Sequence, residues 1–265
     1  MKLRYSARTD VGKKREINED SYGPPELAAQ NGAGQLLVVC DGMGGHAAGE
    51  VASEMAVQII SRELAGITDI NGDTVTARVA EALKKANSKI YERTITEVDK
   101  QGMGTTASVL ILTGSRYLIG QVGDSRVYLL RDGKLKQLTK DHSYVQEQVD
   151  AGFLTPEQAR YHPYSNVITR CVGASDSVEP DTYNGEVKTG DVYLVASDGL
   201  TGMVDDRRLQ QLLFSRATPG RVVDALISEA NGRGGLDNIT AIVVQVTAAE
   251  GNGSDGPTSE TPAVR

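Results

Sequence analysis

The chain has 265 residues, of which 28 are Lys or Arg and 35 are Asp or Glu, so its net charge is −7 at neutral pH. This acidic balance argues against a nucleic-acid partner, because contact with a phosphate backbone needs clustered basic side chains. Cys40 and Cys171 form no CxxC pair and are too few for a disulfide framework. No stretch approaches the roughly 18 apolar residues of a membrane span, and residues 1–10 contain no signal-like apolar core. We therefore expect a cytoplasmic, soluble monomer without a membrane or nucleic-acid partner.

Short apolar runs predict β-strands, because they are rich in β-branched residues and are bounded by Gly or Asp. They are residues 36–40, 107–112, 117–122, 127–131, 192–196 and 239–246. The three runs between 107 and 131 leave no room for crossover helices, so we expect them to form an antiparallel meander. Ser115-Arg116 and Asp132-Gly133 stand where hairpin turns would lie.

Much of the chain between these runs has the apolar periodicity of a helix. Apolar residues recur at helical spacing in 51–64 and 79–90, and further helices are predicted at 205–214 and from Pro219 to residue 230. Strands in runs with helices in pairs favour an α+β architecture over a doubly wound sheet. We assign residues 1–247 to one domain. Within it the polar segment 143–165, with two short helix candidates, is predicted to be a flap, and residues 248–265 are predicted to be a disordered tail.

Aspartates stand next to the strands at several points in the sequence. Those that draw attention are Asp20, Asp41, Asp124, Asp198 and Asp237. One Asp-Gly pair is only a turn signal, and Asp132 and Asp191 are interpreted in that way. Several carboxylates at strand ends would repel one another, however, unless cations lay between them. Oxygen ligands favour Mg²⁺ or Mn²⁺, and the three histidines lack the spacing of a zinc site.

Arg15 lies just before the acidic segment Asn18-Glu19-Asp20. A guanidinium beside a metal cluster suits a phosphate group, because its planar fork can bind two oxygens at once. On its own, Arg15 would be taken for a surface residue of the basic run that includes Lys13 and Lys14. The acidic motif that follows favours the phosphate-binding role.

Six ordered motifs resemble those of the PP2C-type (PPM) protein phosphatases, and in particular their bacterial branch. They are Arg15-x-x-Asn18-Glu19-Asp20, Asp41-Gly42-Met43-Gly44-Gly45-His46, Gly104-Thr105-Thr106, Val122-Gly123-Asp124-Ser125-Arg126, Ser197-Asp198-Gly199-Leu200 and Asp237-Asn238-Ile239-Thr240. Each motif is weak alone, but the similarity extends in order over residues 4–247. It implies a β-sandwich of two antiparallel sheets flanked by helical pairs, in α-β-β-α layers.

The resemblance also implies an activity. Members remove phosphate from phosphoserine and phosphothreonine in proteins, using a metal-activated water and two Mn²⁺ or Mg²⁺ ions, and bacterial members often bind a third ion. A protein of this kind has phosphorylated proteins as partners, including a Ser/Thr kinase whose action it opposes. Two cations can lower the pKa of a shared water enough for attack on phosphorus near neutral pH.

The family's site residues transfer to this chain by motif. Asp41 would bridge two metals, the Gly42 carbonyl would bind one of them, and Asp198 and Asp237 would complete the shell of the other. Asp124, with Asp198, would hold the third ion. Asp20 and Glu19 would act through metal-bound water. Arg15 would hold the substrate phosphate.

One position departs from the pattern of many eukaryotic members, which have a His proposed as general acid where this chain has Met43. Met cannot donate a proton, so the leaving group must be protonated by another group, either His46 or a metal-bound water. Helix capping or a hydrogen bond behind the metal site would explain His46 equally well. His142 and His162, at or in the flap, are interpreted as structural or solvent-exposed.

Two alternative functions stay open at this point. A non-catalytic relative would bind phosphorylated partners without hydrolysing them, and the loss of metal aspartates would indicate it. The five aspartates named above are all present, which favours the enzyme. A phosphatase of small phosphoesters is the other alternative, and assays with peptide and small substrates would separate the two.

Overall fold

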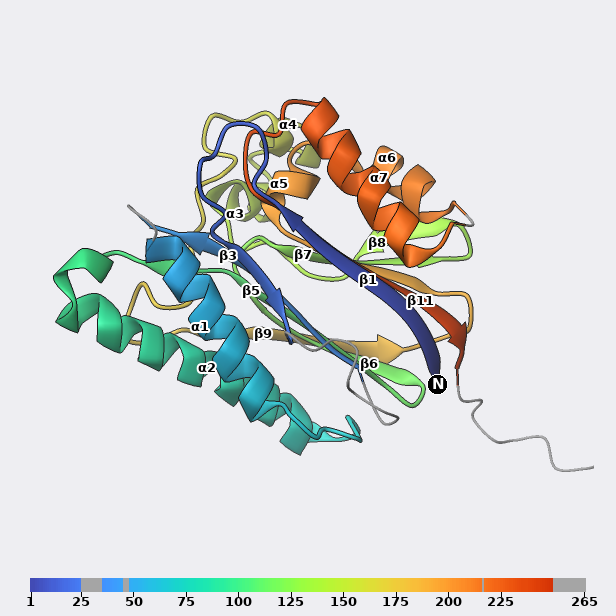
Figure 1. Cartoon of the computed structure of the whole chain (residues 1–265), viewed down its shortest axis with the longest axis horizontal. Helices are drawn as coiled ribbons and strands as arrows, with labels where there is room; N and C mark the ends of the chain where they lie inside the picture. The colour runs from blue at the N-terminus through green and yellow to red at the C-terminus, as the bar shows by residue number, and fades with distance from the viewer. Residues whose placement is uncertain (25–34, 45–47, 216, 250–265) are drawn as a thin grey trace, which may run out of the picture.

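The computed structural model describes residues 1–24, 35–44, 48–215 and 217–249, and it shows two β-sheets stacked face to face with helices on both outer faces (Figure 1). Residues 250–265 of the predicted tail lie outside the described residues. Within the described segments, no helix has the length and apolar character that crossing a membrane requires.

All strand pairs are antiparallel. The first sheet has the order β1 (Lys2–Asp10), β11 (Ile239–Ala248), β10 (Val192–Ala196), β7 (Arg126–Arg131) and β8 (Lys134–Gln137). The second has the order β2 (Asp20–Gly23), β3 (Gln35–Met43), β5 (Ala107–Thr113), β6 (Arg116–Val122) and β9 (Asp181–Glu186), and β4 (Gly104–Thr105) pairs with the end of β3.

Apolar side chains from both sheets fill the space between them. Leu37 and Val39 of β3 point inward with Tyr193 and Val195 of β10, and all four are fully buried. The alternate residues of the same strands face the helices, as the two-residue period of a strand requires. This double burial explains why β3, β5, β10 and β11 appear in the sequence as nearly continuous apolar runs.

The helices cover the two outer faces. The outer face of the second sheet is covered by α1 (Ala48–Glu63) and α2 (Asp73–Thr96), with the short η2 (Val98–Lys100) after them. The first sheet is covered by α5 (Asp198–Thr201), α6 (Asp206–Leu213) and α7 (Pro219–Gly232). The predicted α+β sandwich with helical pairs on its outer faces is confirmed.

The predicted three-stranded meander is wrong in its third strand. β5 and β6 pair as a hairpin with Thr113 opposite Arg116, so its turn comes one residue earlier than predicted. β7 instead joins the other sheet, where it pairs with β10 and β8. The chain crosses between the sheets at Gly123, whose φ of 100° lies in a region that favours glycine. The turn at Asp132-Gly133, with φ of 49° and 74°, joins β7 to β8 as predicted.

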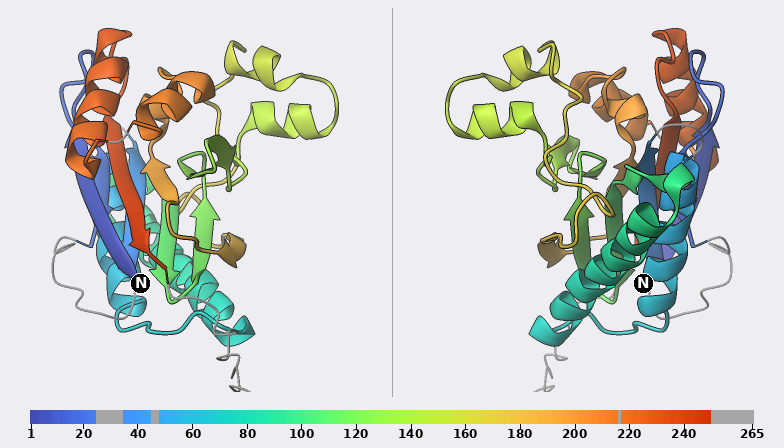
Figure 2. Two further views of the ribbon diagram at one scale, coloured as in Figure 1. Left: turned by 90° about the vertical axis from the view of Figure 1, so that its right-hand side faces the viewer. Right: turned by 90° about the vertical axis from the view of Figure 1, so that its left-hand side faces the viewer.

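The flap consists of two short helices, α3 (Tyr144–Asp150) and α4 (Pro156–Arg160), which project from the body of the sandwich (Figure 2). Ser143 caps α3 by accepting a hydrogen bond from the Gln146 amide. Thr155 and Gln158 form a reciprocal capping box at the start of α4. Both helices lie where the sequence predicts them.

Candidate metal centre

The predicted aspartates of both sheets meet at one end of the sandwich. Asp20 and Asp41 are opposite each other in the pairing of β2 with β3. Burial raises the pKa of Asp41 well above its ordinary value, and the charges of Asp20, Asp198, Asp124 and Asp237 raise it further. The turns and strand ends that carry these residues therefore bring five carboxylates within electrostatic reach of one another.

Asp198 lies close to Asp41 in this cluster. Burial and the charge of Asp237 raise the pKa of Asp198, and a side-chain hydrogen bond with Asp41 lowers it by less. Two ionised carboxylates cannot share such a contact unless a proton or a cation lies between them. A divalent cation between Asp41 and Asp198 would remove this repulsion.

Asp20 is the most enclosed of the cluster. Ser197 Oγ donates to its Oδ2 at 2.8 Å, across 177 residues of sequence. Its Oδ1 is buried and has no hydrogen-bond partner among the residues that the structure describes. Burial raises the pKa of Asp20 to about 7, against hydrogen bonds from Thr240 and Ser197 that lower it. An unpartnered buried carboxylate oxygen marks a place for water or for an ion.

Asp124 lies on the crossing between the sheets and is buried. Burial raises its pKa well above the ordinary value, and the charges of Asp198 and Asp141 add to this effect. Asp124 thus lies near enough to Asp198 for the two charges to interact, and an ion held between them is the predicted third ion.

Asp237 faces Arg15. A terminal guanidinium nitrogen of Arg15 donates to Asp237 Oδ2 at 2.8 Å. The Oδ1 of Asp237 accepts from the Asn238 amide. Asn238 also holds the acidic N-terminal segment in place, since its Oδ1 accepts from the Glu19 amide at 2.8 Å. Each carboxylate oxygen has a second lone pair with which it could bind an ion.

Glycine is required at position 42. A Cβ there would lie 2.1 Å from the Gly49 carbonyl and 2.5 Å from the Glu19 carbonyl. The Gly42 amide donates to that Glu19 carbonyl, and the Glu19 carboxylate accepts from the Gly49 amide in the first turn of α1. This close packing places the predicted backbone ligand between the acidic segment and the start of α1.

The residues fit divalent cations by their chemistry. They are oxygen donors, they repel one another without a counter-charge, and one buried oxygen lacks a partner. Among the described residues, no three acidic, His or Cys side chains are placed so that they could hold an ion by themselves. Ions bound here would therefore need backbone carbonyls and water as further ligands, which agrees with the role predicted for Gly42.

Comparison with known proteins decides the family. The sequence profile described as Protein phosphatase 2C matches residues 12–226. The serine/threonine phosphatase stp of Listeria monocytogenes is 39% identical over 239 residues, which cover 90% of this chain and 94% of that protein. The chain belongs to the protein phosphatase 2C family. The serine/threonine protein phosphatase PstP of Mycobacterium tuberculosis is 40% identical over 245 residues, which cover 92% of this chain but 45% of PstP.

Solved structures of the protein phosphatase 2C family agree with the fold. The crystal structure of Mycobacterium tuberculosis PstP matches with a TM-score of 0.82 at 39% identity, covering 92% of this chain and 98% of that one. The catalytic domain of PstP in complex with 2 manganese ions has a TM-score of 0.79 at 38% identity, covering 92% and 97%. Stp1 of Staphylococcus aureus has a TM-score of 0.86 at 33% identity, covering 93% and 96%.

The histidines divide into three cases. His46, the predicted alternative for the general acid, lies outside the described residues. His142 is buried, its Nδ1 accepts from the Gly123 amide at 3.1 Å, and burial lowers its pKa, which agrees with the structural interpretation. His162 is half-buried in the flap and accepts from the Tyr164 amide. Met43 ends β3, as the motif indicates.

Several residues that shape the site carry no strong signal in the sequence. Ser197 and Asn238 occur in the family motifs without a predicted role, and in the structure they fix Asp20 and Glu19. Asp191 is also more than a turn residue, because it is fully buried in an ion pair with Arg131. Only the position of each residue in three dimensions identifies these partners, since the contacts join segments far apart in the chain.

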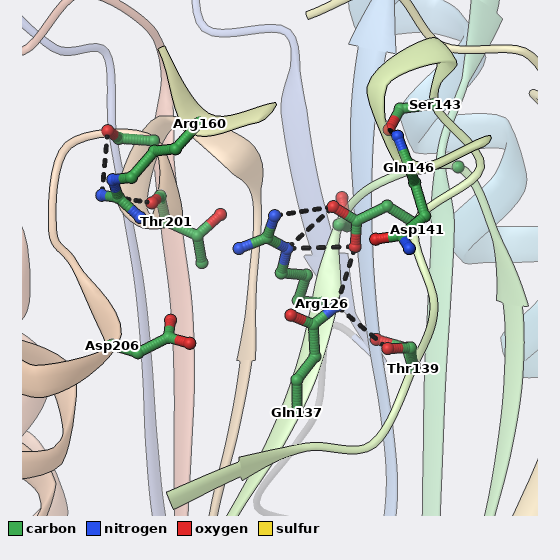
Figure 3. Close-up of polar contacts among 12 residues, drawn as sticks. Arg126, Gln137, Thr139, Asp141, Ser143, Gln146, Arg160, Thr201 and Asp206 are labelled. Carbon is green, nitrogen blue, oxygen red and sulfur yellow. Dashed lines mark hydrogen bonds and ion pairs between the residues drawn. The ribbon is translucent and has the colours of Figure 1, made fainter. Parts of the chain in front are cut away.

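Polar contacts around Asp141 and Arg160 hold the flap against the body of the protein (Figure 3). Arg126, two residues after Asp124, binds both carboxylate oxygens of Asp141 at 2.6–3.0 Å. Gln137 donates to the same Asp141. Arg160 of α4 donates to the Thr201 carbonyl at the end of α5. The flap is therefore tied to the core both at its base and through its second helix.

Proposed function

We propose that this chain is a metal-dependent phosphatase that hydrolyses phosphoserine and phosphothreonine in proteins. The observation that carries the proposal is the convergence of five carboxylates, with Asp20 opposite Asp41 in the pairing of β2 with β3, in a chain that belongs to the protein phosphatase 2C family. Relatives named serine/threonine phosphatases match over most of its length. A structure of one such relative contains 2 manganese ions.

The ions would be held by Asp41, the Gly42 carbonyl, Asp198 and Asp237. Two divalent ions in such a site lower the pKa of water and offset negative charge on the phosphoryl oxygens. Asp20, fixed by Ser197, would orient the attacking water through its buried oxygen.

The hydrogen bond to Asp237 is the main cause that raises the pKa of Arg15. The nearby charges of Asp237, Glu19 and Asp41 raise it further. The Arg15 side chain is 48% exposed, so it can be reached by a substrate. We assign it to the substrate phosphate, which it would bind with the guanidinium donors that Asp237 leaves free.

The finer parts of the proposal rest on the sequence. A third ion at Asp124 and Asp198, opposition to a Ser/Thr kinase, a cytoplasmic location, a role in signalling, a monomeric state and the absence of a nucleic-acid partner stay predictions. The non-catalytic alternative finds no support, since all five aspartates converge. Nothing in the geometry favours small phosphoesters over phosphoproteins.

The test is hydrolysis of a phosphothreonine peptide with Mn²⁺, with Mg²⁺ and with chelator, by the wild type and by Asp41→Ala. We expect activity only with metal, and a loss of at least about a hundredfold in the variant. Asp224→Ala, on the exposed side of α7, is the control and should behave as wild type. Full activity in chelator or an unimpaired Asp41→Ala would refute the metal mechanism. A much higher kcat/KM on a small aryl phosphate than on the peptide would favour the small-phosphoester alternative.

A further inference from the structure

Thr106 lies between β4 and β5 and has almost no exposed surface, at 1%. Its amide donates to the Asp41 carbonyl at 2.8 Å, and its Oγ1 accepts from the Asp41 amide at 2.9 Å. The position of the Asp41 backbone is thus set by both the main chain and the side chain of Thr106. The sequence motif Gly104-Thr105-Thr106 has no role in the proposed function.

The other side of the same side chain contacts the turn that carries Asp124. Thr106 Oγ1 lies 2.7 Å from Ser125 Oγ, in a fully buried hydrogen bond. Its Cγ2 methyl group occupies the space next to Gly123, where a Cβ would come within 2.6 Å of it. Since Oγ1 accepts from the Asp41 amide, its own proton is available for Ser125.

The turn itself is held rigidly on its far side. Gln121 Nε2 donates to the carbonyls of Gly123 and Ser125, at 3.1 and 2.7 Å. Ser108 Oγ donates to the Gln121 side chain at 2.6 Å. These groups are fully buried, so a displacement of the turn breaks several bonds that water cannot replace.

We propose that Thr106 is a positioning residue that couples ion binding at Asp41 to ion binding at Asp124. The inference rests on one part of the proposed function, which is that divalent ions bind at both positions. A shift of the Asp41 backbone on ion binding strains the hydrogen bond from Thr106 to Ser125 and the contact of its methyl group with Gly123, because the turn is held on its far side. By linkage, an ion at Asp124 changes the affinity at Asp41 by the same factor.

The experiment is a double-mutant cycle on Mn²⁺ binding, measured by titration calorimetry and by electron paramagnetic resonance of free Mn²⁺, so it needs no turnover. Asp124→Asn removes the charge at one position, and the change in affinity of the remaining ions reports the coupling. In wild type we expect this change to be about fivefold to tenfold. In Thr106→Val, which keeps the methyl group and loses the hydroxyl, we expect it to fall to the part that the charge of Asp124 exerts directly on Asp41.

Two variants control for a merely structural effect. Thr106→Ser restores the hydroxyl and should recover most of the coupling. Thr105→Val removes a different hydroxyl that donates to the Asp41 carbonyl but does not reach the turn, and should keep wild-type coupling. If Thr106→Val does not fold, Ser125→Ala removes the same hydrogen bond from the turn side and should lose the coupling as well.

Three outcomes would overturn the inference. They are the absence of coupling in wild type, a coupling in Thr106→Val or Ser125→Ala as large as in wild type, and an equal loss in Thr105→Val. The second would mean that the two positions interact through space alone. Failure of the proposed function would look different, because wild type would then show no Mn²⁺-dependent hydrolysis of the phosphothreonine peptide, whatever the titrations gave.

Discussion

Arg126 and Asp141 form a buried ion pair in which the guanidinium binds both carboxylate oxygens, with the shortest contact at 2.6 Å. Asp141 is 8% exposed and stands just before the flap, whereas Arg126 follows the turn that carries Asp124. The pair therefore joins the predicted third-ion position to the base of the flap. Its geometry is bidentate, which makes it one of the stronger forms of ion pair.

Asp141→Asn should destabilise the protein because it leaves the Arg126 charge buried without a counter-charge. We expect a loss of about 3–5 kcal/mol in the free energy of unfolding, measured by chemical denaturation. Asp224→Asn is the matched control, since its partner Arg8 and Asp224 itself are 56% and 52% exposed, and it should cost less than about 1 kcal/mol. Equal losses in the two variants would show that burial does not increase the contribution of the Asp141–Arg126 pair to the free energy of unfolding.

Gly199 allows two segments of the metal centre to touch. A Cβ at this position would lie 1.9 Å from the Asn238 carbonyl oxygen. Gly199→Ala must therefore separate Asp198 from Asp237, and we expect a loss of about 1–3 kcal/mol in stability together with weaker Mn²⁺ binding. Gly232→Ala is the control, because nothing lies within 4 Å of its added Cβ. Wild-type Mn²⁺ affinity in Gly199→Ala would contradict the close approach.

The sequence predicts those elements whose side chains are buried on both faces. β3, β5, β10 and β11 are continuous apolar runs, and the helices from 48 to 96 have clear periodicity. β8 was missed because its residues, Lys134–Gln137, alternate between exposed and half-buried positions at a sheet edge. The sheet that β7 joins could not be predicted, since hairpin spacing does not distinguish a turn within a sheet from a crossing between sheets.

The same limit applies to the metal centre. Places next to strands and the family motifs predict metal ligands at Asp41, Asp124, Asp198 and Asp237. The contacts that hold Asp20 and Glu19 could not be predicted, because Ser197 reaches Asp20 across 177 residues and Asn238 reaches Glu19 across 219. Such contacts depend on how the two sheets are stacked, which a local pattern does not contain.

Arg15→Ala should weaken the binding of phosphopeptide more than the chemical step. Removing a charged hydrogen-bond donor from a half-exposed site should raise KM by about tenfold, with a smaller change in kcat. Lys14→Ala is the control, because it removes an exposed positive charge next to Arg15 and outside the Asp237 contact. An unchanged KM in Arg15→Ala, or an equal rise in Lys14→Ala, would count against a specific phosphate contact.

The stability of the metal-free protein should depend on pH through Asp20. Burial raises its pKa from 3.8 to about 7, so between these values the folded protein holds a proton that the unfolded chain releases. The contribution of Asp20 to the free energy of unfolding must therefore fall as pH rises from about 4 to 7, by up to about 4 kcal/mol.

Asp20→Asn removes this titration and keeps the shape of the side chain. The difference in unfolding free energy between Asp20→Asn and wild type should therefore shift in favour of the variant as pH rises from 5 to 8. Denaturation in chelator at several pH values measures it, and taking the difference cancels the titration of groups far from Asp20, which the two proteins share. Parallel curves for the two proteins would show that Asp20 is ionised in the metal-free fold, and that its unpartnered oxygen is satisfied by water.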